Sequence, residues 1–163
     1  MGYLAGAKAV NPSIVVDSKY LTKPPDFSGF ASVDKGKAAA EGMYQGGADI
    51  VYHAAGGSGG GVFTAAKAAG KLAIGVDSDQ ALTAPADVRD VILTSMIKKV
   101  DVGVYDFIKS IKDGSFKNGV HTFDLKSGGV DYSTTGGKVD DIKAKLDDYK
   151  KQIIDGKITV PAK

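Results

Sequence analysis

Residues 49–80, DIVYHAAGGSGGGVFTAAKAAGKLAIGVDSDQ, decide the fold. A short run rich in β-branched residues, 49–52, enters a glycine loop, and an alanine-rich helical pattern over 62–69 then ends at Gly70. The apolar run 72–76 that follows is typical of a strand buried on both faces. A strand, a helix and a second strand in this order indicate a βαβ unit with parallel strands.

The same alternation continues toward the N-terminus. A helical pattern over 2–10 ends before Pro12, because proline resists helix continuation, and the apolar run 14–16 is predicted to be a strand. Ser32 has the side chain of an N-cap and opens a helix that is predicted to stop at Gly46.

Toward the C-terminus the pattern predicts four further elements. They are a strand over 91–93, a helix over 100–113, a strand over 120–125 and, after a Gly128-Gly129 turn, a helix with its apolar face between 139 and 153. We therefore expect a single α/β domain over 1–163, with a mainly parallel sheet flanked by helices.

Composition narrows the classes of function. The 163 residues carry a net charge of +2 with acids and lysines interspersed, so no basic stripe predicts a nucleic-acid partner. The absence of cysteine excludes a disulfide scaffold, a thiol nucleophile and a cysteine zinc site. No apolar run approaches the roughly 18 residues of a membrane span, and the first ten residues lack the apolar core of a signal peptide. We expect a fragment of a longer precursor.

Two positions at strand ends are candidates for ligand binding, because ligands of open α/β sheets bind beyond the carboxyl ends of the strands. At the first, Gly56 and Gly57 let the backbone approach a ligand closely and precede the free N–H groups of a helix. A tight turn without a ligand is the alternative. At the second, Asp77 is the first residue clear of its strand and can accept hydrogen bonds from the vicinal hydroxyls of a ribose. Asp79, two residues on, equally suits a helix cap or a turn.

A glycine loop followed by an acid also suggests an enzyme. No register of GGSGGGVF satisfies the dinucleotide fingerprint G-x-G-x-x-G, and no Gly-Lys-Ser/Thr follows for a P-loop. Ser58 does not complete a nucleophile elbow with a triad, and His53 is expected to be a packed or hydrogen-bonded residue. We therefore predict no catalytic residue, no metal site and no cofactor. An α/β enzyme that binds a nucleotide phosphate on the glycine loop remains an alternative.

Five segments resemble a known family in order and spacing. The chain is similar to the basic membrane protein (BMP) family of solute-binding lipoproteins of ABC importers, in the strings GYLAGAKAVNP (2–12), GADIVYHAAGGSGGGVFTAAKAAG (47–70), IGVDSDQ (74–80), VILTSMIKKVDVGVYDFIK (91–109) and IIDGKITVP (153–161). The resemblance covers nearly the whole chain, and its segments are specific as a set.

The resemblance implies a type I periplasmic-binding-protein-like fold, in which three crossovers join two α/β lobes and the ligand lies between them. The chain then corresponds to the C-terminal lobe without its first strand. The helix within 97–114 is expected to belong to the other lobe. Freed from that lobe, its apolar face should fold back on the chain's own sheet or pair with a second copy, because exposed apolar patches drive association. The PPDFSGF loop (24–30) departs from shorter members and is expected to alter the rim of the cleft.

The family's nucleoside-binding members imply roles for individual residues. Tyr52 matches the aromatic that stacks on the base, where phenylalanine is more usual. Gly57 matches a backbone contact, Asp77 a carboxylate that binds the ribose hydroxyls, and Lys98 a lysine that reaches the same sugar. For Lys98, a solvated surface lysine is the alternative. The groups that read the purine edge are expected in the other lobe.

The expected function is therefore capture without catalysis. The chain is predicted to be part of the substrate-binding component of an ABC importer that binds a small molecule, a purine nucleoside, and delivers it to permease subunits. The family places such a protein outside the cytoplasm, in the periplasm or on the cell surface, lipid-anchored in its full-length precursor. A folded fragment that binds no ligand, as a single chain or as a homo-oligomer, is the remaining alternative.

Overall fold

The sheet is mainly parallel, as predicted, and it has four strands. A computed structural model describes residues 1–161, with strands adjacent in the order β1 (Ile50–Tyr52), β2 (Leu72–Asp77), β3 (Ile92–Lys98) and β4 (Val130–Tyr132). The first three strands are parallel, and β4 runs antiparallel to β3. The carboxyl ends of β1, β2 and β3 therefore meet at one end of the sheet.

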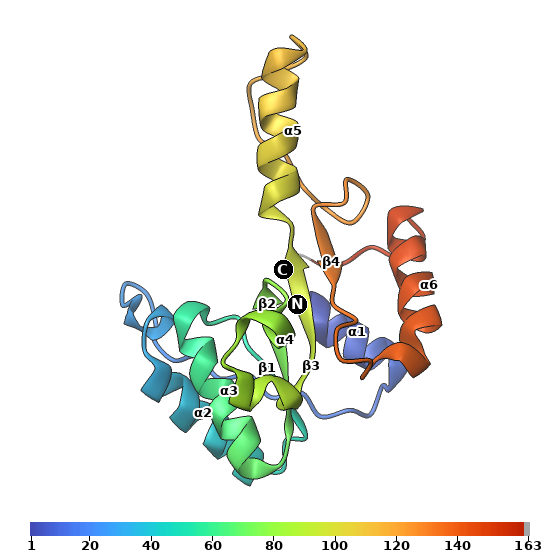
Figure 1. The fold of residues 1–163 in the computed structure, drawn as a ribbon. Coiled ribbons are helices and arrows are strands. Elements are labelled where there is room, and N and C mark those ends of the chain that lie inside the picture. Colours follow the sequence, from blue (N-terminus) through green and yellow to red (C-terminus); the bar gives the residue numbers. More distant parts are fainter. Residues whose placement is uncertain (162–163) are drawn as a thin grey trace.

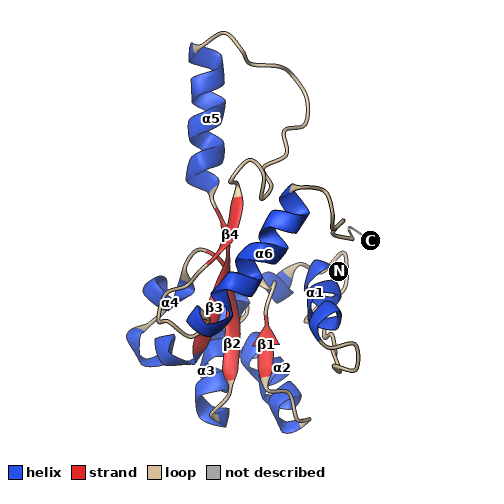
Figure 2. Cartoon of the chain, turned by 90° about the vertical axis from the view of Figure 1, so that its right-hand side faces the viewer, coloured by secondary structure: helices blue, strands red, loops and turns tan. Residues whose placement is uncertain are grey.

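Helices cover both faces of this sheet. Two of them, α2 and α3, pack on one face, while α1 and α6 lie on the other side, and α5 projects away beyond the end of β3 (Figure 1 and Figure 2). The helices are α1 (Gly2–Val10), α2 (Val33–Gln45), α3 (Gly59–Ala69), the single turn α4 (Gln80–Thr83), α5 (Val100–Lys112) and α6 (Lys143–Ile154).

Local signals in the sequence set the ends of α2 and α3. The hydroxyl of Ser32 accepts a hydrogen bond from the backbone N–H of Lys35 at 3.3 Å, which confirms the predicted N-cap of α2. Gly70 ends α3 in the left-handed conformation at φ 62°, where a side chain would be strained.

The core lies between the sheet and the α2–α3 pair. Phe63 and Ile92 are 1% exposed, and small residues of α3 such as Ala65 and Ala66 are fully buried. Glycine allows the two helices to approach at backbone distance: a Cβ atom on Gly61 would lie 2.0 Å from the carbonyl oxygen of Val33. Packing at this distance suits the alanine-rich sequence of α3.

Two predicted strands are wrong. Residues 14–16 and 120–125 form no strand, and Val15 and Val120 are 91% and 98% exposed. A strand needs a neighbour for its N–H and C=O groups, and none of the described strands pairs with the outer edge of β1 or with either segment. The chain instead turns at 124–129, where Asp124 and Ser127 exchange hydrogen bonds, and then enters β4.

The amphipathic helix α5 does not fold back on the sheet, contrary to one of the two outcomes expected for it. None of its residues is buried, and Val104, Ile108 and Ile111 are each more than half exposed. Its one aromatic contact is local, between Phe107 and Phe116 at a centroid distance of 5.4 Å. The apolar face of α5 is therefore uncovered in a single copy of the chain.

Substituting Gly61 tests the close approach of α2 and α3. Gly61→Ala should lower the free energy of unfolding by about 1 to 3 kcal/mol, because backbone atoms of α2 occupy the space of the new methyl group. Gly60→Ala is the matched control in the same helix, since no atom lies within 4 Å of its Cβ position. It should be neutral or stabilising by up to about 1 kcal/mol. Urea denaturation measures both, and equal midpoints for the two variants would contradict the packing argument.

Candidate functional site

The ends of the parallel strands bring two predicted ligand residues together. Lys98 Nζ lies 2.8 Å from Asp77 Oδ1, and the two side chains are 57% and 56% exposed. The hydrogen bond with Asp77, together with the charge of its carboxylate, raises the pKa of Lys98. Lys98 is thus held at the strand ends by Asp77, whereas the neighbouring Lys99 bonds to Asp131. The site presents an exposed donor and an exposed acceptor side by side.

Asp77 has an unusual backbone. Its φ of 67° makes it the one non-glycine residue with positive φ in the part of the chain that the structure describes. Two short hydrogen bonds hold the turn: Ser78 N–H donates to the carbonyl of Val76 at 2.8 Å, and Val76 N–H donates to Gln80 Oε1 at 2.7 Å. A left-handed residue other than glycine costs about 1 kcal/mol, and such strain clusters at functional sites.

Tyr52 reaches the same end of the sheet, but its ring is partly covered. It stacks on Tyr3 of α1 with centroids 4.8 Å apart and planes 25° apart. Burial raises the pKa of Tyr52, and the nearby Asp77 carboxylate adds to the rise. One face of the ring is therefore taken by the chain itself, and the role of Tyr52 in stacking on a base remains a prediction.

The glycine loop is tied to the loop that precedes α2. Residues Gly56–Ser58 form a turn of 3-10 helix that leads into α3. The fully buried Ser58 donates its hydroxyl to the carbonyl of Gly29 at 2.6 Å and accepts the N–H of Ser32 at 2.8 Å. Ser58 therefore has a structural role, and its hydroxyl is not free to act as a nucleophile.

This tie places Phe30, an aromatic residue that sequence analysis missed, beside the glycine loop. Phe30 is 53% exposed, and its Cβ and Cδ1 atoms lie 3.5 and 3.6 Å from the position of a Cβ on Gly56. The sequence holds a partial signal, because Phe30 ends the PPDFSGF loop, which is expected to alter the rim of the cleft. Which of its two aromatic residues meets the glycine loop depends on the contacts of Ser58, which no sequence pattern indicates.

His53 is a packed residue, as predicted, although it forms no hydrogen bond. Its ring is 4% exposed, and neither ring nitrogen has a partner among residues 1–161. The ring meets Phe63 edge to face at 5.2 Å and fills the space beside Gly59, where a Cβ would lie 2.1 Å from it. Burial lowers the pKa of His53, while the charge of the Asp77 carboxylate partly opposes that shift.

Asp79 ties two parts of the sheet together. Its Oδ2 atom accepts hydrogen bonds from the hydroxyls of Ser133 at 2.8 Å and Thr135 at 2.6 Å, both just beyond β4. This geometry favours the structural interpretation of Asp79 and leaves Asp77 as the carboxylate that faces solvent.

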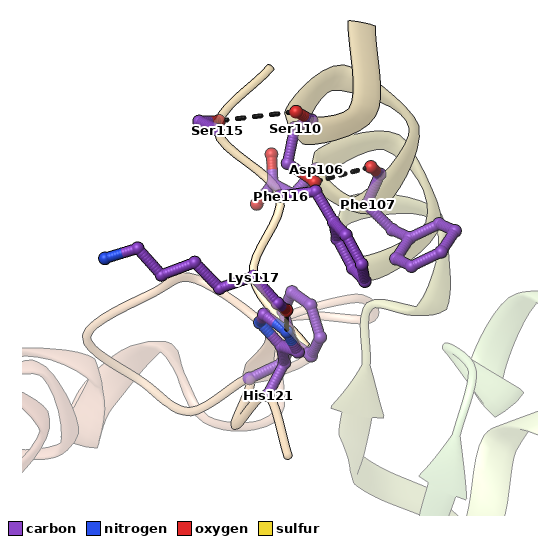
Figure 3. A pocket seen from close by; sticks show the side chains of 8 residues that line it. Asp106, Phe107, Ser110, Ser115, Phe116, Lys117 and His121 are labelled. Carbon is purple, nitrogen blue, oxygen red and sulfur yellow. Dashed lines mark hydrogen bonds between the residues drawn. The ribbon is translucent and has the colours of Figure 1, made fainter. Parts of the chain in front are cut away.

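A hollow of about 320 Å³ lies elsewhere, between α5 and the segment that follows it (Figure 3). There Phe116 packs between Phe107 and His121, at centroid distances of 5.4 and 5.9 Å. None of the predicted ligand residues lines it. Its walls are Asp106, Phe107, Ser110, Ser115, Phe116, Lys117, His121 and Phe123.

Within residues 1–161 no three histidine or acidic side chains gather closely enough to hold a metal ion. No helix in the same range is long and apolar enough to cross a membrane.

Comparison with known proteins identifies relatives along the whole sequence. A family model described as "ABC transporter substrate-binding protein PnrA-like" matches residues 1–163. The "ABC transporter nucleoside-binding protein BmpA" of Lactococcus lactis is 42% identical over 99% of the chain, and the "CD4+ T-cell-stimulating antigen" of Listeria monocytogenes is 39% identical over 99%. The chain spans 48% of the length of each, about half.

Solved structures agree with this result. A solute-binding protein of an Aeropyrum pernix ABC transporter superposes with a TM-score of 0.71 at 27% identity, over 99% of this chain and 53% of its own. A second solute-binding protein, from Conexibacter woesei, has a TM-score of 0.76 at 24% identity over 97% of this chain and 50% of its own, and it shares the fold.

Burial of His53 predicts a pH dependence of stability. Because its pKa in the folded chain is lowered from 6.5, the unfolded chain takes up the proton first. The stability that neutral His53 contributes is full above pH 6.5 and is lost as the pH falls below it, with a slope of up to about 1.4 kcal/mol per pH unit. Denaturation at several pH values should show this loss, and His53→Gln should remove it. His121→Gln, at the other histidine of the sequence, is the control, and an unchanged pH profile in His53→Gln would refute the assignment.

Proposed function

The chain belongs to the family of PnrA-like ABC transporter substrate-binding proteins, and we propose that its strand ends form one wall of a cleft that binds a purine nucleoside for import. The observation that carries this proposal is the exposed pair of Asp77 and Lys98 at the carboxyl ends of β2 and β3. The name of the Lactococcus lactis relative, a nucleoside-binding protein, supports this class of ligand.

The Asp77–Lys98 pair suits the sugar of a nucleoside. A ribose offers vicinal hydroxyls that both donate and accept hydrogen bonds. Asp77 can accept from two hydroxyls, and Lys98, which carries three N–H donors, can donate to one while it stays bonded to Asp77. The left-handed turn aims the carboxylate outward beside Lys98, so a ligand meets two groups that are already in place.

An aromatic ring beside the glycine loop suits the base. Two rings are available, Tyr52 and Phe30. We assign the stacking contact to Phe30, because its ring is exposed beside Gly56, whereas Tyr3 already covers one face of Tyr52. In this arrangement Gly56 and Gly57 bring the backbone close to the ligand, and Tyr52 stays stacked on Tyr3.

The remaining contacts of the ligand are proposed to come from a second lobe. Because the chain spans about half the length of its relatives, it accounts for one wall of such a cleft. We assign the chain to the C-terminal lobe. The open edge of β1 then pairs with a preceding strand. The apolar face of α5 packs against the other lobe, which also fills the hollow beside this helix. The groups that read the purine edge belong to that lobe as well.

This assignment also sets the proposed partners and location. A substrate-binding protein closes its lobes on the ligand and presents the closed form to permease subunits. We place the protein outside the cytoplasm, with a lipid anchor on its precursor. A phosphate-binding enzyme is disfavoured, because the hydroxyl of Ser58 is engaged on both sides and His53 is buried away from the loop surface.

Calorimetry with a two-lobed protein that carries this segment tests the role of Asp77. Asp77→Asn should weaken binding of adenosine, guanosine or inosine at least tenfold, because hydrogen bonds to a charged group contribute about 1.5 to 3 kcal/mol. Asparagine tolerates the left-handed backbone, so the turn persists. Asp90→Asn is the matched control, since Asp90 is also exposed and paired with a lysine, Lys67, far from the strand ends.

Three results would contradict the proposal. Equal affinity in Asp77→Asn would make this carboxylate structural. Stabilisation by ATP or NAD in place of nucleosides would favour the nucleotide enzyme. Micromolar nucleoside binding by the 163-residue chain alone would contradict a shared cleft, since half the contacts should leave only millimolar affinity.

The two aromatic residues can be separated by substitution in the same two-lobed protein. Phe30→Ala should lower nucleoside affinity by about 1 to 3 kcal/mol, roughly five- to a hundredfold, which is typical for loss of a ring that stacks on a base. Phe27→Ala, in the same loop and 67% exposed, should leave affinity unchanged. A larger loss for Tyr52→Ala than for Phe30→Ala would return the stacking role to Tyr52.

A further inference from the structure

Asp131 joins three elements through one carboxylate. It lies in β4, where its Oδ2 atom accepts from Lys99 Nζ at 3.2 Å and its Oδ1 atom accepts from Lys150 Nζ at 2.9 Å. The N–H of Tyr132 also donates to Oδ1, at 3.0 Å. Lys99 stands between β3 and α5, and Lys150 comes from α6. The side chain of Asp131 is only 23% exposed, so the contacts are partly screened from water.

The two lysines at the end of β3 are held in different places. Lys98 reaches Asp77 at the ends of the parallel strands, and Lys99 reaches Asp131 on the neighbouring antiparallel strand. Consecutive side chains of an extended segment point to opposite sides, so the two bonds oppose rotation of the segment about its own axis. The N–H of Lys99 adds a backbone bond to the carbonyl of Gly129 at 2.8 Å.

The same junction sets the direction of α5. No residue of α5 is buried, and the helix extends away from the sheet and from the other helices (Figure 1 and Figure 2). Its packing contacts are few and lie with the segment that follows it: Phe116 packs on Phe107, and the ring of Phe123 lies beside Gly103. Its direction therefore depends strongly on the bonds at its first turn, where Lys99 is the N-cap residue.

We propose that Asp131 is a positioning residue that couples the direction of α5 to the placement of Lys98 at the ligand site. By holding Lys99, it keeps the β3–α5 junction in one conformation, in which Lys98 faces Asp77. The ligand role of Lys98 rests on the proposed function, whereas the coupling itself does not. In a two-lobed protein, where α5 would carry contacts to the other lobe, movement of that lobe would then reach Lys98 through this junction.

Asp131 and the two lysines that it binds, Lys99 and Lys150, form a clamp. The electrostatics of this clamp agree with the proposed role of Asp131. Burial would raise the pKa of Asp131, but hydrogen bonds from Lys150, Tyr132 N–H and Lys99 outweigh it and lower the pKa. The carboxylate is therefore charged at neutral pH. Without that charge, the ammonium groups of Lys99 and Lys150 would lose the carboxylate that lies between them, which favours their separation and movement of the junction.

The clamp can be tested on the 163-residue chain without any ligand. The sequence has no cysteine, so spin labels at Lys109→Cys on α5 and Ala68→Cys on α3 are the only labels, and both positions are exposed. Asp131→Asn and Lys99→Met should each widen the distribution of label distances about twofold, as expected for a junction that opens locally. Asp147→Asn is the matched control: Asp147 joins α6 to β4 by accepting a hydrogen bond from Tyr132, and it pairs with Lys143 of its own helix, but neither partner belongs to the junction.

A second readout follows Lys98 itself. NMR titration of its ammonium group should give a lower pKa in Asp131→Asn than in the original chain, because Lys98 spends less time beside Asp77. Unchanged distance distributions in both variants, or the same widening in Asp147→Asn, would overturn the clamp. A wider distribution with an unmoved pKa of Lys98 would overturn the coupling. Neither measurement uses a nucleoside, so failure of the proposed function would leave these results intact.

Discussion

The structure depends on the approach of α2 to the glycine loop and α3 at backbone distance. A side chain at Gly36 or Gly61 would overlap main-chain atoms of the other segment, at 2.1 and 2.0 Å. Ser58, whose side chain is fully buried, then fixes the contact with two hydrogen bonds. Because buried hydroxyls are costly unless both partners are present, this arrangement specifies one position for the loop that precedes α2. The position of Phe30 beside Gly56 follows from it.

The strand ends have a different physical character. The core side of the glycine loop is buried and closely packed. In contrast, more than half of each side chain of Asp77 and Lys98 is exposed to solvent. The strained turn at Asp77 is kept by Gln80, whose side chain holds the N–H of Val76. A rigid, apolar base thus carries a polar and accessible surface, which is the arrangement that recognition of a small polar ligand requires.

The sequence predicted the parts of this arrangement that local chemistry determines. Alternating strand and helix patterns, the Ser32 cap and the Gly70 stop lie in contiguous residues, and the parallel sheet follows from them. The position of Asp77 at a strand end could be predicted for the same reason. The strand expected at 14–16 and the contact of Phe30 with the glycine loop depend on neighbours distant in sequence: a pairing strand and the hydroxyl of Ser58. Hydrophobic periodicity carries no information about such partners.

An exposed ion pair is a suitable receptor for a ligand that must later be released. In water the Asp77–Lys98 pair contributes at most about 1 kcal/mol, so hydroxyl groups can share its two partners at little cost. If a second lobe closes over the pair, water leaves and the same hydrogen bonds strengthen, because the effective dielectric constant falls. Affinity would then arise on closure and be lost on opening, with no change in the residues that make contact. The proposed site is therefore a preformed surface whose affinity for a ligand depends on what covers it.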